Sequence, residues 1–110
     1  MNIRFALPAD LIMISKLDKH INKDELLYVI NSKRVLVSEE SGEFTGWLRF
    51  NLFWDNTPFM NMLYVIESYR GKDIGSQLVT CWESKMKSLR YKLLMTSTLA
   101  NEKAQNFTGN

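Results

Sequence analysis

The sequence has little of what metal and thiol chemistry requires. Its 110 residues include one cysteine, Cys81, and one histidine, His20. A disulfide within the chain is therefore impossible, and one copy cannot assemble a cluster of histidine and cysteine ligands around a metal. We expect no metal site and a reducing, cytoplasmic environment, where disulfides are rare.

Long apolar runs and a strong charge imbalance are also missing. No apolar stretch approaches the roughly 20 residues that cross a bilayer, and the N-terminal segment MNIRFALPAD lacks the continuous apolar region of a secretory signal. The net charge is +2, and the basic residues are scattered apart from short pairs such as Lys33-Arg34. We therefore expect no membrane and no nucleic acid as a partner. Local basic spots remain compatible with small phosphate-bearing molecules.

What is present suits one globular domain covering residues 1–110. Apolar residues make up 45% of the chain and charged residues 24%, close to the average of globular proteins. We find no internal repeat, low-complexity tract or linker.

The first part of the chain predicts a strand followed by two helices. A short strand is expected at residues 3–6. Pro8 and Asp10 are favoured in the first turn of a helix, and Asn22 can cap a second one. Apolar residues recur at helical spacing in both segments: Leu11, Ile14, Leu17 and Ile21 in the first, and Leu26, Leu27 and Ile30 in the second.

The pattern then changes to strands. Residues 34–40 are rich in β-branched side chains and precede a turn at 41–43. Residues 44–54 alternate in polarity, the turn signal at 55–58 predicts a hairpin, and residues 59–66 are the return strand. The alternation places Leu48, Phe50 and Leu52 on one face, and Trp47, Arg49, Asn51 and Phe53 on the other.

Two interpretations are open for the aromatic residues of this hairpin. Trp47, Phe53 and Trp54 could line an acceptor pocket, with Arg49 and Asp55 fixing a polar group. Aromatic side chains on a hairpin more often belong to a core or an interface.

The last part of the chain predicts a long helix, a strand and the start of another helix. Ile74, Leu78, Trp82, Met86 and Leu89 form one apolar stripe of the long helix. Residues 91–98 are expected to form a buried strand, and residues 100–107 to begin the last helix. Two strands joined through a helix indicate a parallel pair with a right-handed crossover.

The segment ESYRGKDIGSQLV, residues 67–79, lies between a predicted strand and the long helix. The first N–H groups of a helix have no partner within the helix, and its dipole adds positive charge there. Gly71 and Gly75 would let the backbone approach a phosphate closely, and Arg70 and Lys72 add charge. The alternative is a tight turn in which the glycines supply unusual backbone angles. The spacing alone leaves both possibilities open.

The order of elements and this motif resemble the GCN5-related N-acetyltransferases (GNAT) over nearly the whole chain. That family carries R/Q-x-x-G-x-G/A between a strand and a helix, and this sequence matches it at Arg70 and Gly75. The resemblance implies an α/β (α+β) fold: a mixed sheet with antiparallel N-terminal strands, a parallel strand pair after the turn, and flanking helices.

The resemblance also implies acetyl-coenzyme A as cosubstrate. The turn would hold the pyrophosphate, the strand around residues 63–65 would pair with the pantetheine arm and polarise the carbonyl through a backbone N–H, and an asparagine at the start of the last helix would contact that arm. The residues implied are Leu63, Tyr64, Val65, Arg70, Gly71, Lys72, Asp73, Ile74, Gly75, Ser76 and Asn101.

The sequence departs from the family pattern at three places. Asp73 replaces a glycine, and its carboxylate can repel phosphate or cap the helix. Thr108 stands where many members have a tyrosine that protonates the leaving thiolate. We expect the last two strands of the family to be missing, which would leave the fifth-strand edge open and favour a homodimer or larger assembly that covers it.

The general base is not specified by the sequence. Many family members place an acidic residue on the fourth strand, where this chain has Asn61 and Met62. Glu67 follows in the turn region and is a weak candidate base, as Asn61 is a weak candidate for a catalytic role.

The leading hypothesis is therefore an N-acetyltransferase that moves an acetyl group from acetyl-coenzyme A to a primary amine. A second hypothesis is a truncated, catalytically silent domain that binds coenzyme A or contacts another protein. A third is an α/β interaction module in which the turn is purely structural. The sequence does not identify the acceptor.

Overall fold

The computed structural model describes residues 1–53, 57–89 and 95–96. In chain order the elements are β1 (Asn2–Phe5), the 3-10 turn η1 (Pro8–Asp10), α1 (Leu11–Leu17), α2 (Lys23–Asn31), β2 (Val35–Glu40), β3 (Glu43–Phe53), β4 (Thr57–Val65), the 3-10 turn η2 (Glu67–Tyr69), α3 (Ile74–Ser88) and β5 (Met95–Thr96).

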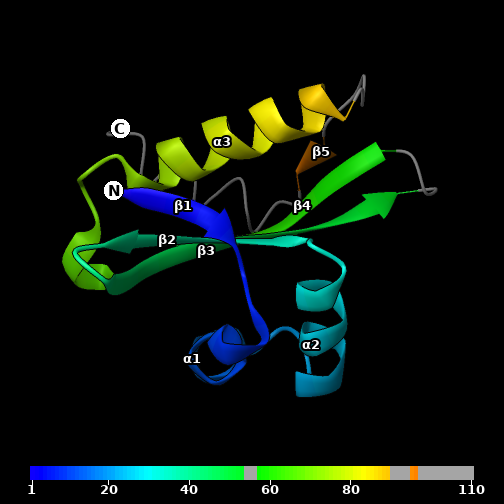
Figure 1. Ribbon diagram of the computed structural model, residues 1–110, viewed down its shortest axis with the longest axis horizontal. Helices are drawn as coiled ribbons and strands as arrows, with labels where there is room; N and C mark the ends of the chain where they lie inside the picture. The colour runs from blue at the N-terminus through cyan, green and yellow to red at the C-terminus, as the bar shows by residue number, and fades with distance from the viewer. Residues whose placement is uncertain (54–56, 90–94, 97–110) are drawn as a thin grey trace.

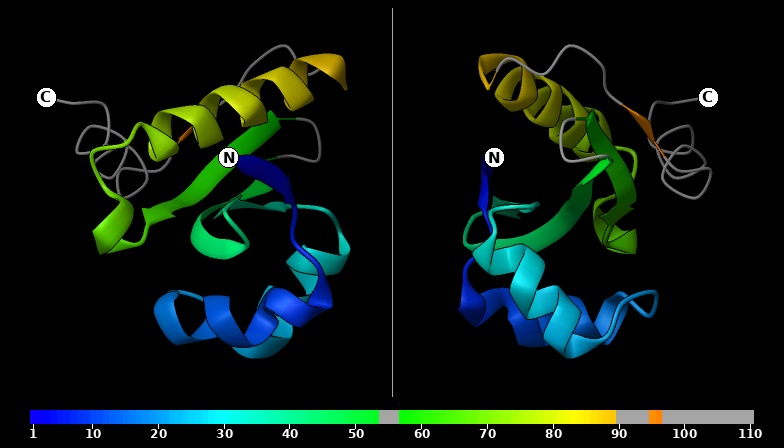
Figure 2. Two further views of the ribbon diagram at one scale, coloured as in Figure 1. Left: turned by 60° about the vertical axis from the view of Figure 1, so that its left-hand side comes forward. Right: turned by 90° about the vertical axis from the view of Figure 1, so that its right-hand side faces the viewer.

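The strands form one sheet in the order β1-β2-β3-β4-β5. Helix α3 covers one face of this sheet, and α1 and α2 lie against the opposite face (Figure 1). The two rotated views in Figure 2 show the same separation of the helices by the sheet. The N-terminal strand β1 is therefore an edge strand, and the sequence-predicted α/β architecture with flanking helices is confirmed.

The first four strands are antiparallel, as the sequence predicts. The hairpin between β2 and β3 turns at Ser41 and Gly42, whose φ angles are 53° and 81°. Positive φ at both central residues belongs to the hairpin turn whose twist matches that of the flanking strands.

The fifth strand is described over two residues. Phe59 and Met60 in β4 lie in parallel register with Met95 and Thr96 in β5. A parallel pair of the length expected from residues 91–98 stays a prediction. The expected last helix, with Asn101 and Thr108, lies outside the described residues.

Alternation along the strands divides the core into two layers. The layer under α3 contains Leu36, Leu48, Phe50, Met60, Leu63 and Val65 from the sheet, and Ile74, Leu78, Trp82 and Met86 from the helix. The layer under α1 and α2 contains Val35, Val37, Trp47 and Met62 with Ala6, Ile14, Leu26, Val29 and Ile30. Trp47 has no exposed surface and stacks on Tyr64 with ring centroids 4.7 Å apart, so it is a core residue rather than the wall of a pocket.

Arg49 is committed to an ion pair inside the second layer. Its Nε lies 3.0 Å from Oδ2 of Asp18, and both side chains are buried. The Asp18 Oδ1 atom also accepts a hydrogen bond from the backbone N–H of His20. Arg49 is therefore a structural cation, and the hypothesis that it fixes a polar group of an acceptor is wrong; Trp54 and Asp55, its proposed companions, lie outside the described residues.

The helix predictions are confirmed in part: α1 ends at Leu17, so Ile21 lies outside it, and Leu17 is 37% exposed. The Asn22 side chain accepts a hydrogen bond from the Glu25 N–H at 2.8 Å, which confirms the predicted cap of α2. On α3 the residues at spacing four are buried, but Leu89 is 61% exposed. Leu89 follows the last helical residue, Ser88, so the buried stripe of α3 ends at Met86. Across the described ranges, no helix combines the length and the apolar character that crossing a membrane would take.

Candidate functional site

Strand β4 carries a bulge in its middle. Arg49 lies opposite Met62, whereas Phe50 lies opposite Met60, so Asn61 is an extra residue on β4. The extra residue shifts the alternation by one position, and Met60, Leu63 and Val65 all face α3. The sequence did not predict this bulge, because Asn61 is not a glycine and the shift is visible only in the pairing of β4 with β3.

After the bulge, the backbone N–H and C=O groups of β4 point alternately toward β3 and away from it. The Ile66 N–H donates to the Thr45 carbonyl at 2.8 Å, which fixes the phase of the antiparallel ladder. Every second pair is hydrogen-bonded, so Tyr64 directs its N–H and C=O toward β3, and Leu63 and Val65 direct theirs away from it. On that outer side, the described part of β5 pairs with β4 at Phe59 and Met60, before the bulge.

Gly46 allows β3 to approach this segment closely. A Cβ atom at this position would lie 2.6 Å from the Tyr64 carbonyl oxygen and 3.3 Å from Val65 Cα. Both neighbours are backbone atoms and cannot rotate away. The absence of a side chain at Gly46 therefore sets the position of Tyr64 and Val65.

The turn after β4 brings the chain from η2 into α3. Gly71 has φ 84° with open space around its Cα, and Asp73 has φ 62° in the left-handed region. Glycine is favoured at such angles, and Asp is among the few other residues that tolerate them. Gly75, the second glycine of the motif, is buried in the first turn of α3.

The start of α3 presents backbone donors to this turn. The first hydrogen bond of the helix runs from the Gln77 N–H to the Asp73 carbonyl at 3.0 Å. Within the described part of the chain, no group accepts a hydrogen bond from the N–H of Ile74, Gly75 or Ser76. The Asp73 carboxylate does not cap the helix, so the prediction that it could do so is wrong: with Asp73 itself in the left-handed conformation, its exposed side chain makes no cap bond. These donors and the helix dipole together favour an anion.

Two cations flank the turn, and aromatic rings hold both. The Arg70 Nε donates to the Val65 carbonyl at 2.9 Å, and its guanidinium lies 5.2 Å from the centre of the Tyr64 ring. The Lys72 ammonium lies 5.3 Å from the centre of the Tyr69 ring. These contacts restrict two long side chains next to the donors of α3, which lowers the entropy lost when they bind an anion.

Tyr69 is itself fixed by Glu43 at the start of β3. Its hydroxyl donates a hydrogen bond to the Glu43 carboxylate. That hydrogen bond, with a contribution from burial, raises the pKa of Tyr69 above its ordinary value. Tyr69 therefore stays a neutral donor under Lys72 at physiological pH.

The two weak catalytic candidates lie on different parts of this segment. Asn61 is half-buried at the bulge and lines a pocket of about 280 Å³ with Asn51, Leu52 and Phe59. Glu67 is exposed at the first position of η2, beyond the end of β4. Their catalytic roles stay predictions. Among the described residues, no group of three or more His, Cys, Asp or Glu side chains could hold a metal ion.

Those residues predicted to bind the coenzyme that the structure describes thus lie on one continuous path. It runs from Leu63 and Val65, through the turn at Arg70 and Lys72, to the first N–H groups of α3.

The model of the acetyltransferase (GNAT) family matches residues 10–108 of the sequence. The chain belongs to the GNAT family. A comparison with curated proteins gives no match.

Solved structures with the GNAT fold resemble the chain at low sequence identity. The Rv2747 protein of Mycobacterium tuberculosis, solved in complex with CoA, is 18% identical with a TM-score of 0.81, covering 93% of this chain and 67% of that protein. The N-acetylglutamate synthase of Neisseria gonorrhoeae, complexed with coenzyme A and N-acetyl-glutamate, is 20% identical with a TM-score of 0.80, covering 92% of this chain and 26% of the synthase. The Salmonella typhimurium protein yncA, solved with acetyl-CoA, is 24% identical with a TM-score of 0.73, covering 87% of this chain and 68% of that protein. At these identities the likeness establishes the fold.

Proposed function

We propose that this GNAT domain binds acetyl-coenzyme A and transfers the acetyl group to a primary amine. The observation that carries the proposal is the continuity of backbone donors: the outward-facing groups of Leu63 and Val65 lead into a turn where the N–H groups of Ile74, Gly75 and Ser76 converge. The bound coenzymes in the mycobacterial and Salmonella structures support the same ligand class for this chain.

The turn would hold the pyrophosphate of the coenzyme. The N–H groups of α3 would donate to phosphate oxygens, and Arg70 and Lys72 would supply two positive charges beside the turn. The pantetheine arm would lie along the outer side of β4 and hydrogen-bond to Leu63 and Val65 as an added strand does. One of these groups already has a partner, because the Val65 carbonyl accepts a hydrogen bond from the Arg70 Nε.

The chemical step needs little from side chains. The amine nitrogen attacks the thioester carbon, a C–N bond forms, the C–S bond breaks, the amine nitrogen loses a proton and the thiolate takes one up. The N–H of Leu63 is the better placed donor to the developing oxyanion, because the bulge at Asn61 separates it from the part of β4 that pairs with β5. The acceptor amine would reach this point from the pocket beside Asn61, with Glu67 or water taking its proton.

A catalytically silent coenzyme-binding domain is the alternative that one observation favours. The exposed carboxylate of Asp73 stands at the entrance of the anion turn and carries the same charge as phosphate. A carboxylate at this position would repel phosphate without removing any backbone donor, so a domain that binds coenzyme weakly is compatible with this arrangement. A cytoplasmic location stays a prediction from the sequence.

The proposal is tested by incubating the purified chain with acetyl-coenzyme A and a panel of small-molecule and peptide primary amines. Release of the free thiol and the mass increase of one acetyl group on the acceptor are followed together. Amine-dependent thiol release that is lost in an Arg70→Ala, Lys72→Ala variant supports transfer. Saturable binding of the coenzyme without transfer to any amine would instead support the silent domain.

A further inference from the structure

A second pocket lies at the opposite end of α3 from the coenzyme turn. It has a volume of about 430 Å³ and lies where the end of α2, the end of β3 and the last turn of α3 meet, with β1 alongside. By the rise of an α-helix, Lys85 in this pocket is about 16 Å along α3 from Ile74. The pocket is therefore separate from the turn that binds the coenzyme in the proposed function.

The pocket combines an apolar floor with a cationic rim. Phe50 and Met86 are buried and form the floor, and Phe5, Leu52 and Leu89 add apolar surface. The rim carries three cations and two hydroxyl groups: Lys33, Arg34, Lys85, Ser32 and Ser88. No carboxylate from the described residues lines it.

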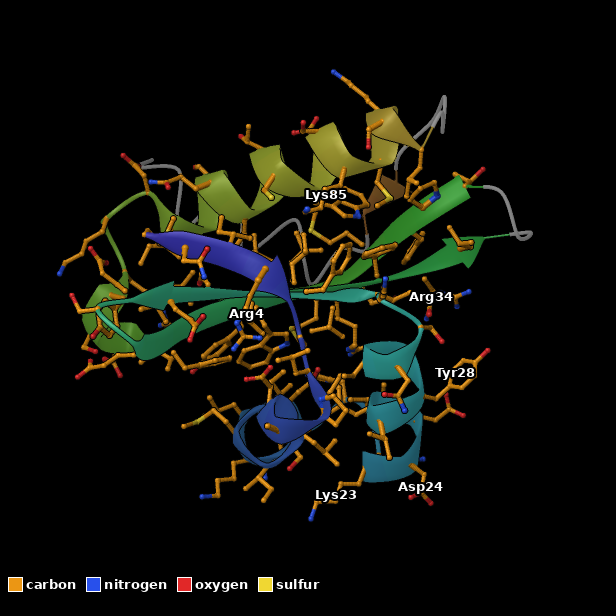
Figure 3. All side chains as sticks on the ribbon, viewed as in Figure 1. Arg4, Lys23, Asp24, Tyr28, Arg34 and Lys85 are labelled. Carbon is orange, nitrogen blue, oxygen red and sulfur yellow. The ribbon has the colours of Figure 1, made fainter. Side chains whose placement is uncertain are left out.

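The three cations have no acidic partner among the described residues. The ion pairs in that part of the chain involve Arg4 and Arg49. Arg34 donates a long hydrogen bond of 3.4 Å to the Asn51 amide oxygen. The Lys85 ammonium lies 4.9 Å from the centre of the Phe5 ring, and its side chain extends from α3 toward the sheet (Figure 3). Three positive charges at one pocket exceed the net charge of +2 of the whole chain.

The backbone at Lys33 is an independent observation. Lys33 has φ 59°, and the Arg34 and Lys33 N–H groups donate to the carbonyls of Val29 and Ile30 at the end of α2. This is the helix-ending motif in which the left-handed position is usually glycine. A lysine there adopts an unfavourable conformation and extends a charge at the pocket rim, and such backbone outliers concentrate at functional sites.

The alternative interpretation is that Lys33, Arg34 and Lys85 are ordinary solvated cations near helix ends. A cation is favoured at the C-terminus of a helix, and Lys33 and Lys85 both lie near one. That interpretation explains neither the convergence of both with Arg34 on one apolar hollow nor the presence of a lysine at a left-handed residue where glycine is usual. The C-terminus of a helix carries about half a negative charge. The helix ends therefore do not neutralise the three cations of the pocket.

We propose that this pocket binds an organic anion with an apolar body, such as a carboxylate or phosphate monoester attached to an aliphatic chain or ring. The anionic group contacts Lys33, Arg34 and Lys85, and the apolar body covers Phe50 and Met86. The shared chemistry is one anionic head and one apolar tail, and the site is independent of acetyl transfer.

The test is a nuclear magnetic resonance titration of the isotope-labelled full chain with octanoate and, in a second arm, octyl phosphate. Saturable shifts of backbone amides at residues 32–34 and 85–89 are expected. Acetate, which lacks the tail, and octanol, which lacks the charge, should each bind at least tenfold more weakly. Tighter binding of octyl phosphate than of octanoate identifies a phosphate ester as the preferred class, and the reverse identifies a carboxylate.

Three variants make the test specific. Lys85→Gln should weaken octanoate binding about fivefold, and Lys87→Gln, two residues along the same helix and outside the pocket, should leave it unchanged. Lys33→Gly should weaken binding similarly while raising the melting temperature, because glycine relieves the left-handed backbone. Equal effects of Lys85→Gln and Lys87→Gln, the absence of saturable shifts, or loss of the shifts in Arg70→Ala would overturn the proposal.

Discussion

At the scale of single residues, Asp73 decides how well the anion turn works. It has φ 62° and its side chain makes no cap hydrogen bond to α3, so its carboxylate contributes charge at the turn without satisfying a helix donor. Asp73→Gly should remove about 1 kcal/mol of backbone strain and tighten acetyl-coenzyme A binding by removing a repulsive charge. Urea unfolding measures the first effect, and calorimetric titration measures the second.

Asp73→Asn is the matched variant that separates charge from strain. Asparagine has the same shape and tolerates the left-handed conformation, so it removes the charge alone. We expect it to reproduce the gain in coenzyme affinity with little change in stability. Unchanged affinity in both variants would mean that the carboxylate points away from the phosphate.

Gly46 tests whether the edge of β4 positions the coenzyme. Gly46→Ala places a Cβ atom 2.6 Å from the Tyr64 carbonyl oxygen, which must move. We expect a loss of about 1–3 kcal/mol in the free energy of unfolding and weaker coenzyme binding, because Val65 shifts with its neighbour. Gly42→Ala, at the tip of the β2–β3 hairpin, is the control: it destabilises through its positive φ but should leave coenzyme affinity unchanged. Full affinity in Gly46→Ala would contradict a binding role for this edge.

Single residues also mark where sequence reasoning stops. Arg70, Lys72 and the helix start at Ile74 could be predicted because the motif is contiguous in the chain. The ring contacts of Tyr64 and Tyr69, the bond from Arg70 to Val65 and the bulge at Asn61 depend on the pairing of β3 with β4, which no local pattern encodes.

At the scale of elements, Arg4 connects the edge strand β1 to its surroundings. It forms ion pairs with Asp10 of η1 at 2.9 Å and with Glu39 of β2 at 2.8 Å. Burial would raise the pKa of Asp10, but hydrogen bonds from Arg4 and from the Leu7 N–H, with the charge of Arg4, hold it below its ordinary value. The hydrogen bond from Arg4 likewise lowers the pKa of Glu39.

These ion pairs of Arg4 predict that the stability of the fold depends on pH. A carboxyl group with a depressed pKa stabilises the fold above its ordinary pKa, and the contribution is lost as the pH falls through the depressed value. The free energy of unfolding should therefore fall below about pH 4. In Arg4→Met the fall should be shallower, whereas Lys16→Met, an exposed control on α1, should follow the unmodified chain. Parallel pH profiles of all three proteins would show that Arg4 does not link these groups.

Helices and strands were predictable where the apolar residues recur with a clear period, as in α3 and in β2 to β4. Leu89 was predicted to belong to the apolar stripe of α3 but lies just past the helix end at Ser88, a boundary that its apolar side chain does not indicate. The pocket around Lys33 and Lys85 joins residues more than fifty positions apart in the chain, so no local sequence pattern indicates it.

At the scale of the whole molecule, the sheet order predicts self-association. Within the described residues β5 is the last strand of the sheet, and open strand edges pair with other chains. We expect a homodimer or larger assembly, measured by sedimentation equilibrium over a wide range of concentrations. A monomer at all concentrations would contradict the prediction that a second copy covers this edge.

The measurement that tests the coenzyme site most directly is a calorimetric titration with acetyl-coenzyme A at low salt. Desulfo-coenzyme A and ATP serve as comparison ligands, and Lys87→Ala, at the far end of α3, serves as the control variant. We predict saturable binding that weakens in Arg70→Ala, measured at a temperature where that variant remains folded, and that persists in Lys87→Ala. No binding at millimolar coenzyme, or equal loss in both variants, would contradict a coenzyme site at the turn between β4 and α3.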